Sequence, residues 1–194
     1  MPEVVWSCGD PANECPVRFL PERPRRSIQN MPSTRPPVDY IERTRAQYDA
    51  LGYPPYQWVH NPTPPPWAEL EKPLADCRVG LIGSGGIYRV GQVAFHYKDD
   101  FSFRIVDTRA PTSQLRATHF AYDLTDARSD PNVVFPVDTL NDLVGEGFIG
   151  ELAENAYAFM GGIYSSRKVR DTLAPALAER VVRDEVDVVL LVPV

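Results

Sequence analysis

The run Gly83-Ser84-Gly85-Gly86 could support chemistry, because it directly follows the short apolar segment Arg78–Ile82. Glycine permits positive φ and a close approach of the backbone. A glycine turn after a strand often holds a phosphate or carboxylate group. Three interpretations stay open: a dinucleotide site, a plain tight turn, and a small-anion site formed by the serine hydroxyl and the glycine amides. The dinucleotide interpretation is disfavoured because Tyr88 stands where the third glycine of G-x-G-x-x-G would fall, and no P-loop lysine follows.

A second polar stretch contains His119 and, four residues later, Asp123. Loops that hold such groups on a rigid sheet are where function concentrates. His119 could act as a general base or as an orienting donor, with Asp123 beside it, or it could be a hydrogen-bonded structural residue. Asn132 is a candidate for substrate binding, whereas Asp138 is expected to cap a helix that starts near Thr139.

The segment Tyr157–Gly162 joins an apolar aromatic run to a pair of glycines. Packing alone would explain the aromatic residues. The glycines leave a second interpretation open, in which Gly161 belongs to a turn that faces a ligand.

Metal and cysteine chemistry find little support in the sequence. The three cysteines, Cys8, Cys15 and Cys77, are widely spaced and lack the paired spacings of a zinc site. We therefore expect no metal site and no catalytic cysteine among them. Cys77 opens an apolar run and is expected to be a small core residue.

Alternating strand and helix patterns must position these candidates, and they predict an α/β domain over residues 76–194. Strands are expected at Arg78–Ile82, Phe103–Val106, Thr118–Tyr122 and Asp187–Val192, and helices at Val137–Val144 and Arg167–Arg183. The run Asp187–Val192 is continuously apolar after its aspartate, which is typical of a strand buried on both faces of a parallel sheet. Pro175 is an internal breaker, so two helical pieces or a kink are expected as readily as one straight helix.

Most of the 20 prolines precede this domain. Met1–Asn30 shows no helical or strand period and is expected to be a disordered leader, with Met31 as an alternative start. Residues 31–75 are expected to form a helix within Val38–Leu51 and then an arm rich in proline and aromatic residues. We interpret it as an arm laid across the domain. Alternatively, it could dock on another subunit or act as a polyproline ligand.

The composition excludes several classes of protein. With 43% hydrophobic residues, the 194-residue chain can build one core. A formal net charge of −6 provides no basic field for nucleic acid or an anionic membrane. No stretch reaches the ~18 apolar residues of a membrane helix, and no signal peptide is recognisable. We expect a cytoplasmic protein whose partner is a small molecule or another protein.

Five segments together resemble one protein family, the selenoprotein B family of glycine, sarcosine and betaine reductases, which also includes D-proline reductase subunits. The similarity covers about Val38–Val194, and NVVFP and LLVPV are its most specific parts. The segments are Val79–Ile87, Asp130–Asp138, Ile149–Leu152, Phe159–Gly161 and Val186–Val194.

The resemblance implies a reductase component with a Rossmann-like, mostly parallel open sheet and helices on both faces, incomplete at its C-terminus. In the family, a selenocysteine or cysteine follows the strand that matches VDVVLLVPV, so the nucleophile is expected just after Val194 and no cofactor is expected within this chain. Selenocysteine is encoded by a codon otherwise read as stop, so the resemblance implies a truncated product. The nucleophile would attack the carbon beside the amino group of the substrate.

Ser84, Gly85, Gly86, Asn132 and Gly161 are then expected to bind a small amino-acid-like substrate, with His119 and Asp123 as helpers. A thiol redox protein is a candidate electron donor, and an oligomer is compatible with the family. A non-catalytic module that binds a small anion or a protein partner in the same crevice is the alternative.

Overall fold

The computed structural model describes residues 39–57 and 59–194. The expectations for Met1–Asn30, for a start at Met31, and for Cys8 and Cys15 lie outside these residues. The chain divides into two units, Met1–Trp58 and Val59–Val194, which are described separately. No helix within the described residues is both long enough and apolar enough to span a membrane.

The described part of the first unit contains one helix, α1 (Tyr40–Ala50), as predicted. Asp39 caps it, because its Oδ1 accepts hydrogen bonds from the amides of Ile41 and Glu42 at 3.0 Å each. After the helix, the ring of Tyr53 packs edge-on against that of Tyr48, with 5.9 Å between the centroids.

The second unit begins with an exposed extended segment, residues 59–72, in which 81% of Trp67 is accessible to solvent. The prediction that the aromatic arm packs on the domain is therefore wrong for Trp67. A 3₁₀ turn, Leu74–Asp76, then leads into the first strand.

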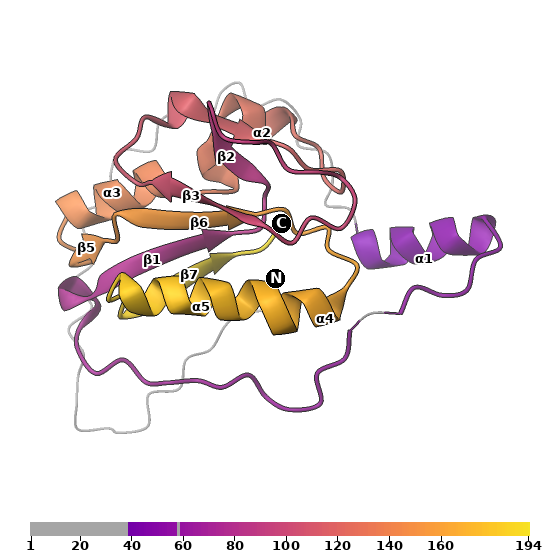
Figure 1. The fold of residues 1–194 in the computed structure, drawn as a ribbon, viewed down its shortest axis with the longest axis horizontal. Coiled ribbons are helices and arrows are strands. Elements are labelled where there is room, and N and C mark those ends of the chain that lie inside the picture. The colour runs from indigo at the N-terminus through magenta and orange to yellow at the C-terminus, as the bar shows by residue number, and fades with distance from the viewer. Residues whose placement is uncertain (1–38, 58) are drawn as a thin grey trace, which may run out of the picture. The chain divides into compact units, whose positions relative to one another are not determined.

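The main sheet has the strand order β3-β6-β1-β7, in which β5 extends the side occupied by β6. Its strands are β1 (Arg78–Gly83), β3 (Phe103–Asp107), β5 (Glu151–Leu152), β6 (Asn155–Phe159) and β7 (Val188–Val192). Val79 of β1 pairs with β5 on one side and β7 on the other, and Ile82 likewise pairs with β6 and β7. These pairs are parallel, and β3 runs antiparallel to β6. The sheet is mixed but mostly parallel, with β1 at its centre (Figure 1).

A separate two-stranded ribbon pairs β2 (Ile87–Arg89) with β4 (Leu115–Ala117), which follows a 3₁₀ turn at Thr112–Gln114. The predicted strand Thr118–Tyr122 is wrong. The amide of Thr118 still donates to the oxygen of Gly86 at 3.0 Å, but the chain then turns away from the ladder.

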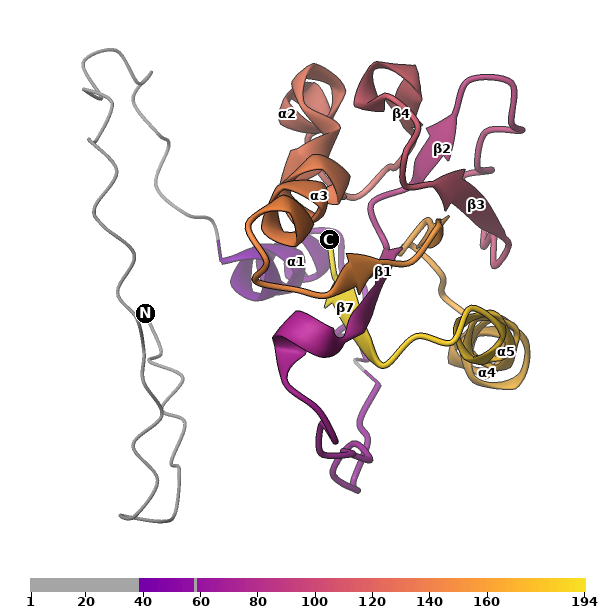
Figure 2. The ribbon, with the colours of Figure 1, turned by 90° about the vertical axis from the view of Figure 1, so that its left-hand side faces the viewer.

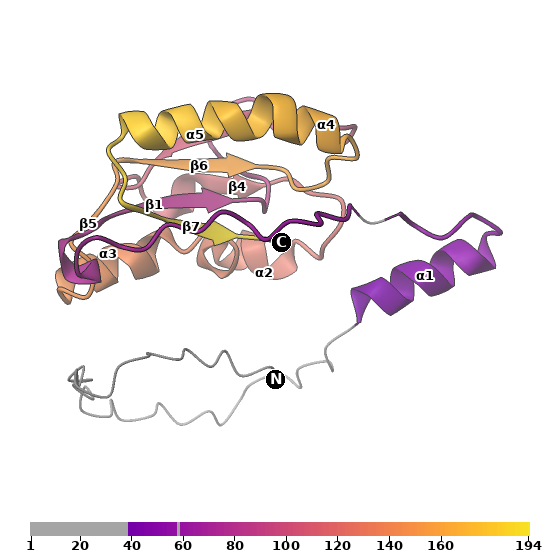
Figure 3. The same ribbon diagram turned by 90° about the horizontal axis from the view of Figure 1, so that it is seen from below.

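Helices cover both faces of the main sheet, as Figures 2 and 3 show. On one face lie α2 (Thr125–Ser129) and α3 (Val137–Gly145), joined through the 3₁₀ turn Pro131–Val133. Their apolar side chains pack in one cluster with Val79 and Leu81 of β1.

On the other face lies the coil formed by α4 (Ser166–Lys168), a π-helical segment (Val169–Leu173) and α5 (Ala174–Arg183). Leu173 and Leu177 pack there against Tyr157 of β6. The helical pieces meet just before Pro175: the π-helical segment ends at Leu173, and the proline falls in the first turn of α5, where its missing N–H is tolerated.

The strand β7 differs from its prediction in burial. Val188 and Val192 pack on the core, but Leu190 and Leu191 are 39% and 66% exposed. Within residues 59–194, β7 pairs only with β1 and lies at an edge of the sheet. The expectation of burial on both faces is therefore wrong for the described chain.

Candidate functional site

The carboxyl ends of β1, β6 and β7 meet at one edge of the sheet, because the three strands are parallel. Backbone hydrogen bonds join their tips: the amide of Ser84 donates to the oxygen of Val192 at 3.0 Å, and the amide of Gly161 donates to the oxygen of Ser84 at 2.8 Å. The amide of Gly86 donates to the oxygen of Phe159 at 2.9 Å. The glycine turn is therefore part of a fixed edge rather than a free loop.

Ser84 also contacts the end of the described chain through its side chain. Its Oγ accepts a hydrogen bond from the amide of Val194 at 2.9 Å. The serine is half-buried, so a group at the edge can reach the hydroxyl. The structure thus brings the predicted turn together with the end of LLVPV.

Steric constraints explain the two glycines that follow Ser84. A Cβ on Gly86 would lie 1.9 Å from the oxygen of Thr118, and its φ of +70° is rarely adopted by other residues. A Cβ on Gly85 would meet Cβ of Val134 at 3.0 Å and Cγ2 of Val194 at 3.4 Å. Among residues 59–194, no backbone oxygen outside the strands accepts from the amide of the buried Gly85.

Gly161 and Gly162 also allow close contacts. A Cβ on Gly161 would lie 3.2 Å from both Cβ and Oγ of Ser84, and one on Gly162 would lie 2.2 Å from Cζ of Phe120. Gly161 therefore borders the serine, and its neighbour accommodates an aromatic ring.

His119 lies deep beside the turn, with only 4% of its surface exposed. Its Nδ1 accepts a hydrogen bond from the amide of Ala121 at 3.0 Å, so in the neutral ring the proton lies on Nε2. Nε2 has no partner among the described residues. Burial lowers the pKa of His119 below its ordinary value because the charged form loses its hydration. A buried donor without an acceptor costs about 1–3 kcal/mol.

Asp123 and Asn132 make their hydrogen bonds locally. Oδ1 of Asp123 accepts from the amide and hydroxyl of Thr125 at 2.9 and 2.7 Å, at the start of α2. Oδ1 of Asn132 accepts from the amide of Asp138 at 3.0 Å, at the start of α3. The structure thus places Asn132 at the start of α3, whereas Gly85 and Gly161 lie beside the serine.

The cap predicted for α3 is wrong. The helix starts at Val137, so Asp138 lies in its first turn, and its carboxylate accepts from the Thr112 hydroxyl at 2.9 Å. The N-cap residue is Pro136, which has no side chain that can cap the helix, and Asn132 accepts from a first-turn amide instead.

Tyr122 was missed by the sequence reasoning. Its hydroxyl donates to the oxygen of Gly85 at 2.8 Å, and its ring centroid lies 4.8 Å from that of His119. Burial raises the pKa of this tyrosine. No local pattern signals a bond to a residue so far away in the sequence.

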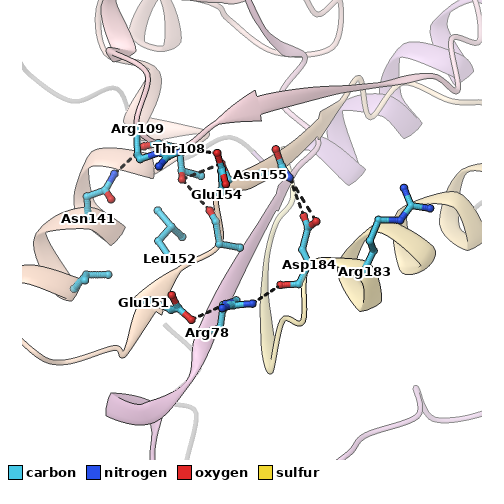
Figure 4. Close-up of a pocket in the computed structure, with 12 residues that line it drawn as sticks. Arg78, Thr108, Arg109, Asn141, Glu151, Leu152, Glu154, Asn155, Arg183 and Asp184 are labelled. Atoms are coloured by element: carbon cyan, nitrogen blue, oxygen red, sulfur yellow. Dashed lines mark hydrogen bonds and ion pairs between the residues drawn. The ribbon is translucent and has the colours of Figure 1, made fainter.

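A hollow of about 530 Å³ lies at the opposite edge of the sheet (Figure 4). Its charged groups are largely paired: Arg78 contacts Glu151 at 2.6 Å, and Arg109 contacts Glu154. Asp184 accepts from the buried hydroxyl of Tyr157. We interpret this network as structural. It holds the strand ends together, and its charged groups are already paired with one another.

Cys77 lies at the amino end of β1, is fully buried, and has the core role that the sequence predicts. It is therefore far along the strand from Ser84. Residues 39–57 and 59–194 contain no group of three or more histidine, cysteine or acidic side chains that could hold a metal ion.

Comparison with known proteins defines the class: the chain belongs to the glycine/sarcosine/betaine reductase selenoprotein B family, which matches residues 64–194. It is 35% identical over 130 residues to the D-proline reductase subunit gamma of Acetoanaerobium sticklandii, covering 66% of this chain and 54% of that protein. It is 33% identical over 158 residues to the glycine reductase complex component B subunit gamma of Symbiobacterium thermophilum, covering 78% of this chain and 35% of that protein. The chain thus spans about half of one relative and a third of the other. No solved structure matches it.

Proposed function

We propose that this protein is a subunit of a reductase complex that acts on a small amino-acid-like substrate at the carboxyl edge around Ser84. The names of its relatives support a place in such a complex. The observation that carries the proposed site is the 2.9 Å hydrogen bond from the amide of Val194 to Oγ of Ser84. A reactive group just after Val194 would emerge beside this hydroxyl.

The reactive group in this proposal is a selenol or a thiol, as the family resemblance implies. Its anion would bond to the carbon that carries the amino group of the substrate, while the carbon–nitrogen bond breaks and the amine leaves with the bonding electrons. A dithiol, supplied by a thiol redox protein, would then become a disulfide as its two electrons and two protons cleave the selenium–carbon or sulfur–carbon bond, which releases the deaminated acid with a hydrogen on that carbon and regenerates the selenol or thiol.

The chain's own contribution is to hold the substrate's carboxylate. The hydroxyl of Ser84 and the amide of Gly85 are the donors at the edge, and both are fixed by the joined strand tips. Cys77 is excluded as the nucleophile because it is buried at the other end of β1.

The first test is to read the codon after that of Val194. UGA or a cysteine codon, followed in frame by further coding sequence, supports the proposal. An ordinary stop codon without an extension contradicts it and favours a module that binds a small anion without chemistry.

The second test is an assay of the protein that carries cysteine immediately after Val194 together with the downstream segment. It is assayed with a dithiol and, in turn, glycine, sarcosine, betaine and D-proline. Ser84→Ala should lower turnover about tenfold to a hundredfold, because one site hydrogen bond is worth ~1–3 kcal/mol. The exposed Ser113→Ala is the matched control and should leave turnover unchanged. Equal turnover in both folded variants would remove Ser84 from the site.

A further inference from the structure

His119 carries a hydrogen-bond donor that the described chain does not use. The bond from the amide of Ala121 to Nδ1 fixes the tautomer, so Nε2 bears the hydrogen. Nε2 is buried and has no acceptor within residues 39–57 and 59–194. Buried polar groups in folded proteins are nearly always paired, so an unpaired one in a fixed orientation points to a missing ligand.

One aromatic side chain stacks on the face of this imidazole. The ring of Phe120 stacks on that of His119 with 5.6 Å between centroids, and its other neighbour is the ring of Tyr164, at 6.5 Å and nearly parallel. Phe120 is itself 43% exposed, so its ring reaches the surface while the imidazole on which it stacks is buried. Gly162 accommodates it, because a Cβ there would lie 2.2 Å from its Cζ.

The covered donor adjoins the proposed substrate site. Gly162 contacts Phe120, and its chain neighbour Gly161 lies against Oγ of Ser84. From the other direction, Tyr122 contacts both the ring of His119 and the oxygen of Gly85. His119 and Phe120 are therefore each connected through one neighbour to the edge that carries Ser84.

We propose that Nε2 of His119 donates a hydrogen bond to a carboxylate or carbonyl oxygen of a small ligand, which gains access when the Phe120 side chain moves aside. A neutral imidazole with its hydrogen on Nε2 selects an acceptor and excludes an ammonium group, which has only donors to offer. The ligand's identity as a substrate rests on the proposed function. The roles of Nε2 of His119 as donor and of Phe120 as the side chain that moves do not.

His96 provides an internal control. Its Nδ1 also accepts a hydrogen bond from the amide two residues later, Lys98, at 3.1 Å, so the two histidines share a local geometry. His96 is exposed, and its Nε2 is not enclosed by aromatic rings. Only His119 should respond to a specific ligand.

The experiment uses the whole 194-residue chain labelled with nitrogen-15, with the imidazole signals followed by NMR. Acetate is titrated as the probe, with methylammonium as the matched cation and sodium chloride holding the ionic strength constant. Acetate should shift the Nε2–H signal of His119 and slow its hydrogen exchange at least threefold, while the signal of His96 stays in place. Methylammonium should change neither signal.

Two variants separate the donor from its cover. Phe120→Ala should tighten acetate binding about tenfold, because the cover no longer has to move, and His119→Ala should abolish the saturable response. If Phe120→Ala does not fold, Tyr164→Ala removes the outer ring of the stack and should also tighten binding. Equal shifts of both histidines, or no response to acetate in a folded cover variant, would overturn the proposal. Acetate binding without reductase turnover would leave this inference standing and remove only the proposed function.

Discussion

The hydroxyl of Tyr122 and the carbonyl oxygen of Gly85 lie 2.8 Å apart, in a hydrogen bond that ties the loop after β4 to the turn after β1. The bond crosses 37 positions of the sequence. It fixes the backbone of the turn at Gly85, the residue whose amide is the proposed donor at the carboxyl edge.

Replacing Tyr122 with phenylalanine should lower the free energy of unfolding by about 1–2 kcal/mol, because the carbonyl of Gly85 loses its donor. Urea denaturation measures this change. Tyr164→Phe, at a residue that is 67% exposed, is the control and should alter stability by less than about 0.5 kcal/mol. Equal losses in the two variants would contradict the role assigned to the Tyr122 hydroxyl.

Gly86→Ala and Gly91→Ala separate steric clash from backbone strain. Both glycines have positive φ, +70° and +92°, but only Gly86 has a backbone atom, the oxygen of Thr118, within 2 Å of the added Cβ. Gly91→Ala should lose about 1–2 kcal/mol through strain alone, whereas Gly86→Ala should lose more than about 3 kcal/mol. Chemical denaturation measures the loss of stability in both variants. Similar losses would show that the turn can move away from the oxygen of Thr118 without a cost in stability.

Tyr157→Phe should change how stability depends on alkaline pH. Burial and the bond to the carboxylate of Asp184 both raise the pKa of Tyr157 above its ordinary value of 10.0. The folded protein therefore keeps this proton when the unfolded chain has lost it, so stability should fall as pH rises above about 10.

In Tyr157→Phe this contribution to the loss of stability at alkaline pH should vanish. The free energy of unfolding should then fall less steeply between pH 9 and 11. Tyr97→Phe, at a residue that is 60% exposed, should keep the slope of the parent protein. Unfolding in urea at several pH values makes the comparison. A slope unchanged by Tyr157→Phe would mean that this phenol titrates alike in both states.

Leu191→Ser should leave the stability of this chain within about 0.5 kcal/mol, because the leucine is 66% exposed on the edge strand β7. It should also reduce self-association, since an exposed apolar edge favours pairing between chains. Light scattering measures the second effect. Leu177→Ser, at a residue that is 7% exposed, is the contrasting variant and should lose about 2–5 kcal/mol.

Local apolar patterns were sufficient to predict β1, β3, α3 and β7 to within about two residues, because each pattern describes which side chains must leave water. They failed at Thr118–Tyr122, where alternation resembled a strand. There the Nδ1 of His119 accepts the amide of Ala121, and this bond produces a turn that no periodicity reports.

The pairing of the strand tips could be anticipated for the edge around Ser84, since parallel strands end together. The burial of β7 could not, because it depends on what lies beside the strand rather than on its own residues. The hydroxyl of Tyr122 and the ring of Phe120 were missed for a related reason: each acts on a residue at least 37 positions away, Gly85 and Gly162 respectively.

The placement of β1 between β6 and β7 has a consequence for synthesis on the ribosome. The backbone amide of Arg78, at the start of β1, bonds with a residue 109 positions later, Asp187. At roughly 5–20 residues per second, about 5–20 s pass between the emergence of the two. Throughout that interval one edge of the central strand β1 is unpaired. Its free backbone groups can then pair with strands of other nascent chains on the same messenger RNA. Slow decoding after Phe159 would lengthen this exposure, and a chaperone bound to nascent chains would shield it.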